Sequence, residues 1–360
     1  MNETMRAAVL HAPGDFSIET VPVPQPGYGE VLVKIKSVSI CGSDPGIFGG
    51  AVLKDGWPPH YPFIAGHEFA GVVEALGEGV ATLKIGDRVA GEAHCGCGIC
   101  EMCKKGLYNL CRNYGRAGHH HYGHATPGCY AQYQVYDQKA LTVMPDNVGF
   151  DEGSTVDTAG IAFHGISLAG IVPGGWTAII GPGPMGILLM QMAKAMGSKT
   201  IVIGYNDPDR LRMAKQTGAD HVIETLETPD VVEAVRALTG GAGADRSFDC
   251  AGAGDTLDKA IRMTASEGHV AVIAYPKQTT TQEALYYMVK NEITVHGVRA
   301  NPNCSARVLG LMSGGKLRVG EIITHRFPLE RLHEAFDTFV NHKDGAIRVV
   351  IHPNGEEEPA

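Results

Sequence analysis

From Thr177 onward, short apolar runs alternate with helical stretches, and this alternation most constrains what the chain can fold into. The apolar runs predict strands at 177–180, 200–203, 221–223, 248–250 and 270–273. The stretches between them predict helices at 185–196 and 208–217, each ending at a glycine. Strands that alternate with helices form a parallel, doubly wound sheet. We therefore predict an α/β fold for this part of the chain.

The first 150 residues or so have a different pattern. Val31–Val38 alternates with period two around two lysines, as a half-buried strand does. Glycines between short apolar runs in Gly66–Val80 are typical of β-rich, barrel-like structure. A chain of 360 residues is longer than a single hydrophobic core usually serves. We predict one domain over 1–160 and a second over 161–298, and the last segment, 299–360, loses the alternation.

Charge and hydropathy exclude some partners. The net charge of −9 argues against nucleic acid or an anionic membrane as the main partner. No apolar run reaches the length of a membrane span. The first residues lack a basic stretch followed by an apolar one, so we expect no signal peptide and a cytoplasmic location.

A glycine-rich loop stands between the first strand and the first helix of the alternating region. Its three glycines, Gly181, Gly183 and Gly186, form G-x-G-x-x-G, with Pro184 and Met185 at the helix start. Such a loop lets the backbone approach a pyrophosphate at a helix N-terminus. In this strand–loop–helix context it predicts a site for NAD or NADP.

The choice between the two nucleotides depends on the end of the second strand, where an acid favours NAD. Tyr205 holds that position, followed by Asn206 and Asp207. Asp207 could still reach the ribose, and Arg210 could meet a 2′-phosphate or be a solvated helix residue. Both cofactors stay open.

Four cysteines are spaced C-x2-C-x2-C-x7-C in a short polar loop. They are Cys97, Cys100, Cys103 and Cys111. Clustered thiolates of this spacing favour one tetrahedral Zn²⁺, and a four-sulfur site leaves no open position for chemistry. We predict a structural zinc site. Cys95, just outside the pattern, is an alternative to Cys97 as a ligand.

Cys41 and His67 are residue types that ligate zinc, and His67 begins a longer motif. The segment from Gly66 to Val80 reads G-H-E-x2-G-x5-G-x2-V. Together with the four-cysteine loop and the glycine-rich loop, in this order, it resembles the zinc-dependent medium-chain alcohol dehydrogenase superfamily. The resemblance covers nearly the whole chain. The segments 86–94 and 109–113 are similar to its polyol (sorbitol) and threonine 3-dehydrogenase branch.

The resemblance implies a GroES-like catalytic domain, a Rossmann domain and a C-terminal return to the catalytic domain. It also implies two zinc ions per chain. The predicted ligands of the catalytic zinc are Cys41, His67, Glu68 and Asp157, with Asp151 and Glu152 as rival acids to Asp157. Glu68 is expected either to ligate directly or to sit beside the metal.

The resemblance also suggests catalytic roles for Ser43, Glu68, His94 and Arg299. Ser43 matches the hydroxyl that starts the family's proton relay. The relay histidine often found three residues later is replaced by Gly46, so the proton must leave by another route, through His94 or the histidine loop 119–124.

The pocket candidates are polar, which favours a zinc-dependent oxidoreductase acting on a secondary alcohol of a polyol, sugar or cyclitol. The alternatives are L-threonine 3-dehydrogenase and a non-enzymatic nucleotide sensor or structural relic of the fold. Loop 119–124 has four histidines. They could bind a further metal, hydrogen-bond a polyhydroxylated substrate, or lie in a solvated loop. Trp57, His60 and Tyr61 could line the pocket or pack the barrel. The partners expected are a small polar alcohol or ketone and further copies of the chain, as a tetramer or dimer.

Overall fold

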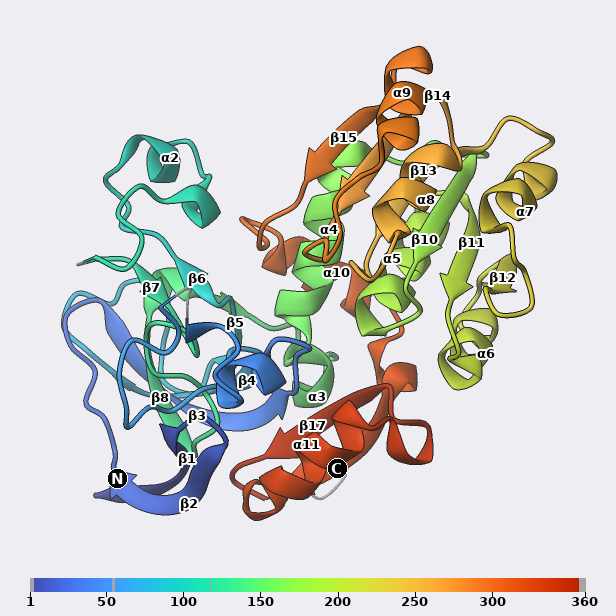
Figure 1. Cartoon of the computed structure of the whole chain (residues 1–360). Coiled ribbons are helices and arrows are strands. Elements are labelled where there is room, and N and C mark those ends of the chain that lie inside the picture. Colours follow the sequence, from blue (N-terminus) through green and yellow to red (C-terminus); the bar gives the residue numbers. More distant parts are fainter. Residues whose placement is uncertain (1–2, 54–55, 117, 356–360) are drawn as a thin grey trace. The chain divides into compact units, whose positions relative to one another are not determined.

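A computed structural model describes residues 3–53, 56–116 and 118–355. The chain divides into two compact units (Figure 1). The first comprises Met1–Thr158, Ser305–Ser313 and Ile323–Ala360, and the second comprises Ala159–Cys304 and Gly314–Ile322. The C-terminal strands therefore join the unit that the N-terminal strands begin.

The first unit is built on a seven-stranded sheet and two two-stranded sheets. The large sheet runs β16-β17-β3-β4-β5-β9, with β8 also paired to β3. Its strands are β3 (Glu30–Ser39), β4 (Phe69–Leu76), β5 (Arg88–Gly91), β8 (Tyr133–Asp137), β9 (Leu141–Val143), β16 (Ile323–Pro328) and β17 (Arg348–His352). The small sheets pair β1 (Thr4–Ala12) with β2 (Asp15–Pro22), and β6 (His94–Cys95) with β7 (His120–His121).

Short helices complete this unit. They are α1 (Asp44–Phe48), α2 (Glu101–Lys104), η2 (Tyr108–Leu110), η3 (Gln138–Ala140), α3 (Phe150–Gly153), α10 (Ser305–Ser313), η5 (Leu329–Arg331), α11 (Leu332–Val340) and η6 (Lys343–Gly345). The long helix α4 (Val156–Ala169) begins in the first unit and continues into the second.

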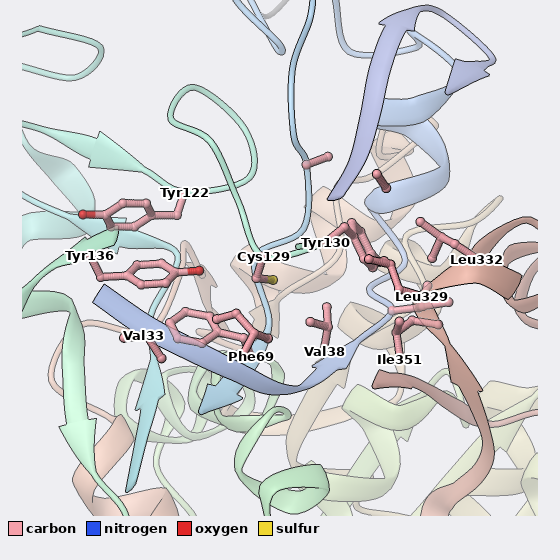
Figure 2. Packing of buried hydrophobic residues seen from close by; sticks show 14 of the residues in the cluster. Val33, Val38, Phe69, Tyr122, Cys129, Tyr130, Tyr136, Leu329, Leu332 and Ile351 are labelled. Atoms are coloured by element: carbon pink, nitrogen blue, oxygen red, sulfur yellow. The ribbon is translucent and has the colours of Figure 1, made fainter. Parts of the chain in front are cut away.

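Aromatic rings and aliphatic side chains from distant segments form the core of the first unit (Figure 2). Phe69 stacks on Tyr136 with ring centroids 4.1 Å apart. The ring of Tyr122 is tilted against that of Tyr136, with centroids 4.6 Å apart. Val38 and Ile351 belong to the same cluster and are paired across β3 and β17. Burial of this apolar surface joins the C-terminal strand to the N-terminal sheet.

The second unit contains a six-stranded parallel sheet in the order β12-β11-β10-β13-β14-β15. The strands are β10 (Trp176–Ile180), β11 (Lys199–Gly204), β12 (His221–Glu224), β13 (Ala244–Asp249), β14 (Thr264–Val272) and β15 (Thr294–Gly297). Its helices are α5 (Pro184–Ala195), α6 (Pro208–Gln216), α7 (Val231–Leu238), α8 (Thr256–Arg262), α9 (Gln282–Lys290) and η4 (Val319–Ile322).

This order reverses between β10 and β13, as in a Rossmann fold, and the predicted α/β class with a β-rich first part is confirmed. Each strand predicted from the alternation is present, and α5 and α6 begin within one residue of the predicted helices. Among the described residues, every helix is too short or too polar to cross a membrane.

Candidate active site and metal centres

Antiparallel pairing of β3 with β4 brings the first two metal-ligand candidates together. Val38, near the end of β3, pairs with Phe69, the first residue of β4. Cys41 follows β3 by two residues, and His67 and Glu68 directly precede β4. Residues 26 positions apart in the chain therefore meet at one end of the sheet.

Cys41, His67 and Glu68 form one of two groups in the described chain whose side chains could hold a metal ion. Their ligand atoms lie within 4.8 Å of one another. Asp44 orients two of them: its Oδ1 is 3.4 Å from His67 Nδ1, and its Oδ2 accepts a 2.8 Å hydrogen bond from the Cys41 N–H. The Nε2 of His67 is left for the metal, and this donor set fits zinc.

Glu68 is fully buried and is engaged by two further side chains. It forms an ion pair with Arg348, the first residue of β17, and its Oε1 accepts a 2.5 Å hydrogen bond from the Thr158 hydroxyl. Arg348 also donates to Thr158 Oγ1 at 2.9 Å and to the Ile40 carbonyl at 3.1 Å. The arginine balances the charge of the carboxylate, which would otherwise be costly to bury.

The structure does not place Asp157 in this metal group. Asp157 is buried in the first turn of α4, and its Oδ1 accepts a 3.1 Å hydrogen bond from the Ala93 N–H. The rival acids lie elsewhere, because Asp151 pairs with Arg326 and His352 while Glu152 accepts from the Gly149 N–H. Asp157 as a ligand stays a prediction.

The second metal group consists of the four cysteines predicted to bind structural zinc. All four sulfurs lie within 4.8 Å of one another. Cys97 Sγ is 3.9 Å from Cys103 Sγ, and Cys100 Sγ is 3.9 Å from Cys111 Sγ. Cys95 is buried outside the group. Four sulfur donors leave no position for substrate.

Four histidine rings of the first unit pack in a row that starts at the metal ligand His67. The His67 ring is tilted by 55° against that of His124, and the other three rings stack face to face. His124 lies 4.6 Å from His67 between ring centroids, His121 stacks on His124 at 3.9 Å, and His94 stacks on His121 at 4.0 Å. We call His94, His121 and His124 the histidine stack. Trp57 meets His121 and His124 edge-on at 5.1 and 5.0 Å.

This packing contradicts the solvated-loop interpretation of residues 119–124. His121 and His124 are only 5% and 6% exposed, and His119 is also buried. Burial, followed by the neighbouring imidazoles, lowers the pKa of His121 well below its usual range, and burial next to His67 lowers that of His124 to about 3. Both rings are therefore neutral at neutral pH. No metal group of the described residues includes them.

Other predicted residues are less constrained. Ser43 is exposed at the N-terminus of α1, and its side chain makes no capping hydrogen bond there. Arg299 is exposed in the second unit, after β15. His60 is exposed, and Tyr61 packs on the core of the first unit. The catalytic roles of Ser43, Glu68, His94 and Arg299 stay predictions.

The glycine-rich loop lines a cavity of about 570 Å³ at the carboxyl ends of the parallel strands. Gly181 has a φ of +102°, which suits glycine. At Gly186 a Cβ would lie 1.9 Å from the Gly181 carbonyl oxygen, so only glycine lets α5 pack this closely. At Gly183 a Cβ would meet nothing within 4 Å, which leaves room for a phosphate at the α5 N-terminus.

Residues after β11 line the same cavity. They include Tyr205, Asp207 and Arg210. Asp207 caps α6, accepting from the Arg210 N–H at 3.2 Å, and its other oxygen is 3.3 Å from Arg210 Nη1. Asn206 has a φ of +50°, and its N–H donates to Glu224 at 2.9 Å. Pro184 and Met185 begin α5 but do not line the cavity.

Comparison with known proteins agrees with this geometry. Residues 27–146 match the alcohol dehydrogenase GroES-like domain, and residues 184–313 match the zinc-binding dehydrogenase family. Sorbitol dehydrogenase of Bacillus subtilis is 32% identical over 98% of both chains. L-threonine 3-dehydrogenase of the same organism is 31% identical over 95% of this chain and 98% of its own.

Solved structures show the same fold. A dehydrogenase from Escherichia coli in complex with NADH is 26% identical, with a TM-score of 0.87 over 98% of this chain and 100% of its own. A putative zinc-binding dehydrogenase from Sinorhizobium meliloti bound to NADP is 28% identical, with the same TM-score and coverage.

The chain belongs to the zinc-containing medium-chain alcohol dehydrogenase family. It is a zinc- and NAD(P)-dependent alcohol or polyol dehydrogenase, with a structural four-cysteine site and a catalytic Cys41–His67–Glu68 site. The alternative of a nucleotide sensor or structural relic is therefore not kept.

Sequence reasoning missed the supports of the catalytic group. Asp44 could have been found because it lies three residues after Cys41, close enough to bond the cysteine's own backbone. Arg348 begins a buried strand and is followed by three apolar residues, and a charge buried in such a strand needs a partner. Nothing local in the sequence names that partner as Glu68.

Proposed function

We propose that the chain oxidises a secondary alcohol of a small polar substrate, a polyol, sugar or cyclitol, and reduces the corresponding ketone. The observation that carries the proposal is the histidine stack, which places polar, uncharged rings directly against the metal ligand His67. A pocket for a simple alkanol would be lined mainly by apolar side chains. The reaction passes a hydride to NAD(P)⁺ and a proton to solvent.

In the proposed reaction, the residues of the chain have the following roles. Cys41, His67 and Glu68 hold the zinc, which when bound supplies a Lewis acid that polarises the alcohol oxygen. Asp44 fixes the His67 ring and the Cys41 backbone. The exposed Ser43 hydroxyl, two residues after Cys41, relays the alcohol proton in this proposal: it accepts that proton as it passes its own to solvent. The glycine-rich loop binds the nucleotide pyrophosphate.

A panel assay tests the proposal. Polyols, sugars, cyclitols, simple secondary alcohols and L-threonine are each supplied with NAD and with NADP, and nucleotide reduction is followed. We expect the highest kcat/KM with a neutral polyhydroxylated substrate. Preference for L-threonine, which the 31% identical threonine dehydrogenase makes the second candidate, would overturn the polyol proposal. We further propose a cytoplasmic homo-oligomer, which light scattering of the purified protein would check.

A further inference from the structure

Two imidazole nitrogens of the histidine stack have no hydrogen-bond partner in the part of the chain that the structure describes. His124 Nδ1 lies 3.2 Å from the Tyr122 carbonyl oxygen, and His121 Nδ1 contacts the Tyr114 hydroxyl. The Nε2 atoms of both rings have no such contact there. Neither is among the fully enclosed unbonded atoms of the described residues, so each reaches open space although its ring is buried.

The bonds on the other nitrogens determine what each Nε2 can offer. A carbonyl oxygen only accepts, so His124 Nδ1 carries the proton and its Nε2 is an acceptor. At His121, the Tyr114 hydroxyl can donate to Nδ1 or accept from it, so Nε2 is a donor in one tautomer and an acceptor in the other. The two neighbouring rings therefore present one acceptor, His124 Nε2, and one nitrogen that can serve as donor or acceptor. A hydroxyl group, which both donates and accepts, can bind to either.

The packing fixes these rings in place. Their planes differ by only 5° and their centroids are 3.9 Å apart, while Trp57 covers an edge of both. Rings stacked in this way present their faces to each other, so an in-plane N–H···N bond cannot pass a proton between them. The arrangement favours recognition by fixed nitrogens over a proton relay through the stack.

We propose that His121 and His124 are specificity-determining residues that bind further hydroxyl groups of a neutral polyhydroxylated substrate, while its reacting hydroxyl lies at the Cys41–His67–Glu68 site. The inference rests on the proposed function and adds the residues that recognise the substrate by hydrogen bonds. Because His124 is next to His67, it binds the hydroxyl nearer to the reacting one, and His121 binds the hydroxyl beyond it.

The test compares His121→Phe and His124→Phe with the wild type on a polyol and on a simple secondary alcohol. Phenylalanine keeps an aromatic ring in the stack but removes the nitrogens. We expect KM for the polyol to rise roughly tenfold for each variant, with kcat nearly unchanged. The kcat/KM for the simple alcohol should stay the same. His124→Gln, which keeps a polar end, should recover part of the loss.

His120→Phe is the matched control. His120 lies in the same short strand β7, on the opposite face from His121, and stacks on Tyr122 at 5.3 Å. This variant should match the wild type on both substrates. Two zinc ions per chain and an unchanged Tm would show that each variant is folded.

Binding gives a second measurement that does not need turnover. The chain has two tryptophans, so in a Trp176→Phe background the fluorescence reports Trp57, which contacts both rings. A polyol should change this fluorescence, and His124→Phe should weaken the response about tenfold. Equal losses on both substrates, or an unchanged polyol KM, would overturn the inference. A wild type without alcohol turnover would instead defeat the proposed function.

Discussion

The Tyr205 side chain is 72% exposed where β11 ends and lines the nucleotide cavity. It cannot act as the anionic acceptor that excludes a 2′-phosphate, and Asp207 is occupied as the cap of α6. We therefore expect weak discrimination against NADP. Tyr205→Asp should shift the ratio of kcat/KM values toward NAD by roughly tenfold to a hundredfold, about 1–3 kcal/mol, measured with both nucleotides.

Asp207→Asn is the comparison variant, since an asparagine can still cap the helix. It should leave the nucleotide preference nearly unchanged. A wild type that already selects NAD strongly, and that loses this selectivity in Asp207→Asn, would show that Asp207 is the selecting residue instead of Tyr205.

Glu92 gives a pH dependence of stability that arises mainly from burial of its carboxylate. It is buried and accepts hydrogen bonds from Tyr108 and Ser305, yet burial raises its pKa from 4.5 to about 7. The folded state therefore holds a proton that the unfolded state releases. This contribution to stability is fully present below about pH 4.5 and is lost as the pH rises through about 7.

Glu92→Gln removes this titration while keeping a polar side chain. The difference in unfolding free energy between variant and wild type should move in favour of the variant by up to about 3 kcal/mol between pH 5 and pH 8. Urea unfolding at several pH values measures it, and comparing the two proteins cancels any shared effect of zinc release. If the difference in unfolding free energy does not change with pH, the Glu92 carboxylate is ionised in the folded protein over the whole range from pH 5 to pH 8.

Among single residues, the sequence predicts those that can be recognised by their spacing from other residues nearby in the chain. The four cysteines, His67 beside Glu68 and the three loop glycines are of this kind. It does not predict partners brought by distant strands, such as Arg348 for Glu68. The polarity of loop 119–124 suggested solvent, whereas the rings bury one another, because imidazole faces can stack when the rings are neutral.

Among the elements, the four-cysteine lobe depends most on its metal. Helix α2 has only four residues and none is buried, so apolar packing contributes little to its stability. Cys100→Ser should release about one zinc per chain and lower Tm, because metal binding supplies folding free energy directly. Serine can still cap α2 in place of Cys100, which accepts from the Cys103 N–H, so the loss would report the metal.

Metal analysis and thermal unfolding measure this outcome. Cys95→Ser is the control, since Cys95 is buried outside the ligand group, and it should retain two zinc ions. Loss of zinc from Cys95→Ser, with retention in Cys97→Ser, would instead support the alternative register of ligands.

The elements of the second unit could be predicted because each strand of a buried parallel sheet is a short apolar run that ends at a turn. The C-terminal strands could not be placed from their own sequence. β17 joins β3 through pairing of Val350 with Ser39, and nothing near residue 350 identifies a partner more than 300 positions away.

For the whole molecule, the division into two units predicts separable functions. Cys41→Ser should lose turnover and the catalytic zinc, yet bind NADH within about twofold of the wild type, because the glycine-rich loop lies in the other unit. Gly183→Asp is the reciprocal variant, since it puts a negative side chain into the space beside α5. It should lose nucleotide binding and keep two zinc ions. Loss of both properties in either variant would show that the units are not independent.

The pairing of β17 with β3 also bears on how the protein forms during synthesis. Every residue of the second unit precedes Ile323 in the chain, whereas the first unit needs β16 and β17. As the polypeptide leaves the ribosome, the nucleotide-binding half can fold first, while the edge of β3 waits for a neighbour that is translated about 310 codons later. During that interval only the end of β3, at Val38 and Ser39, lacks the neighbour that β17 supplies, because residues 30–34 already pair with β8. An unpaired strand edge of this kind can pair with another chain.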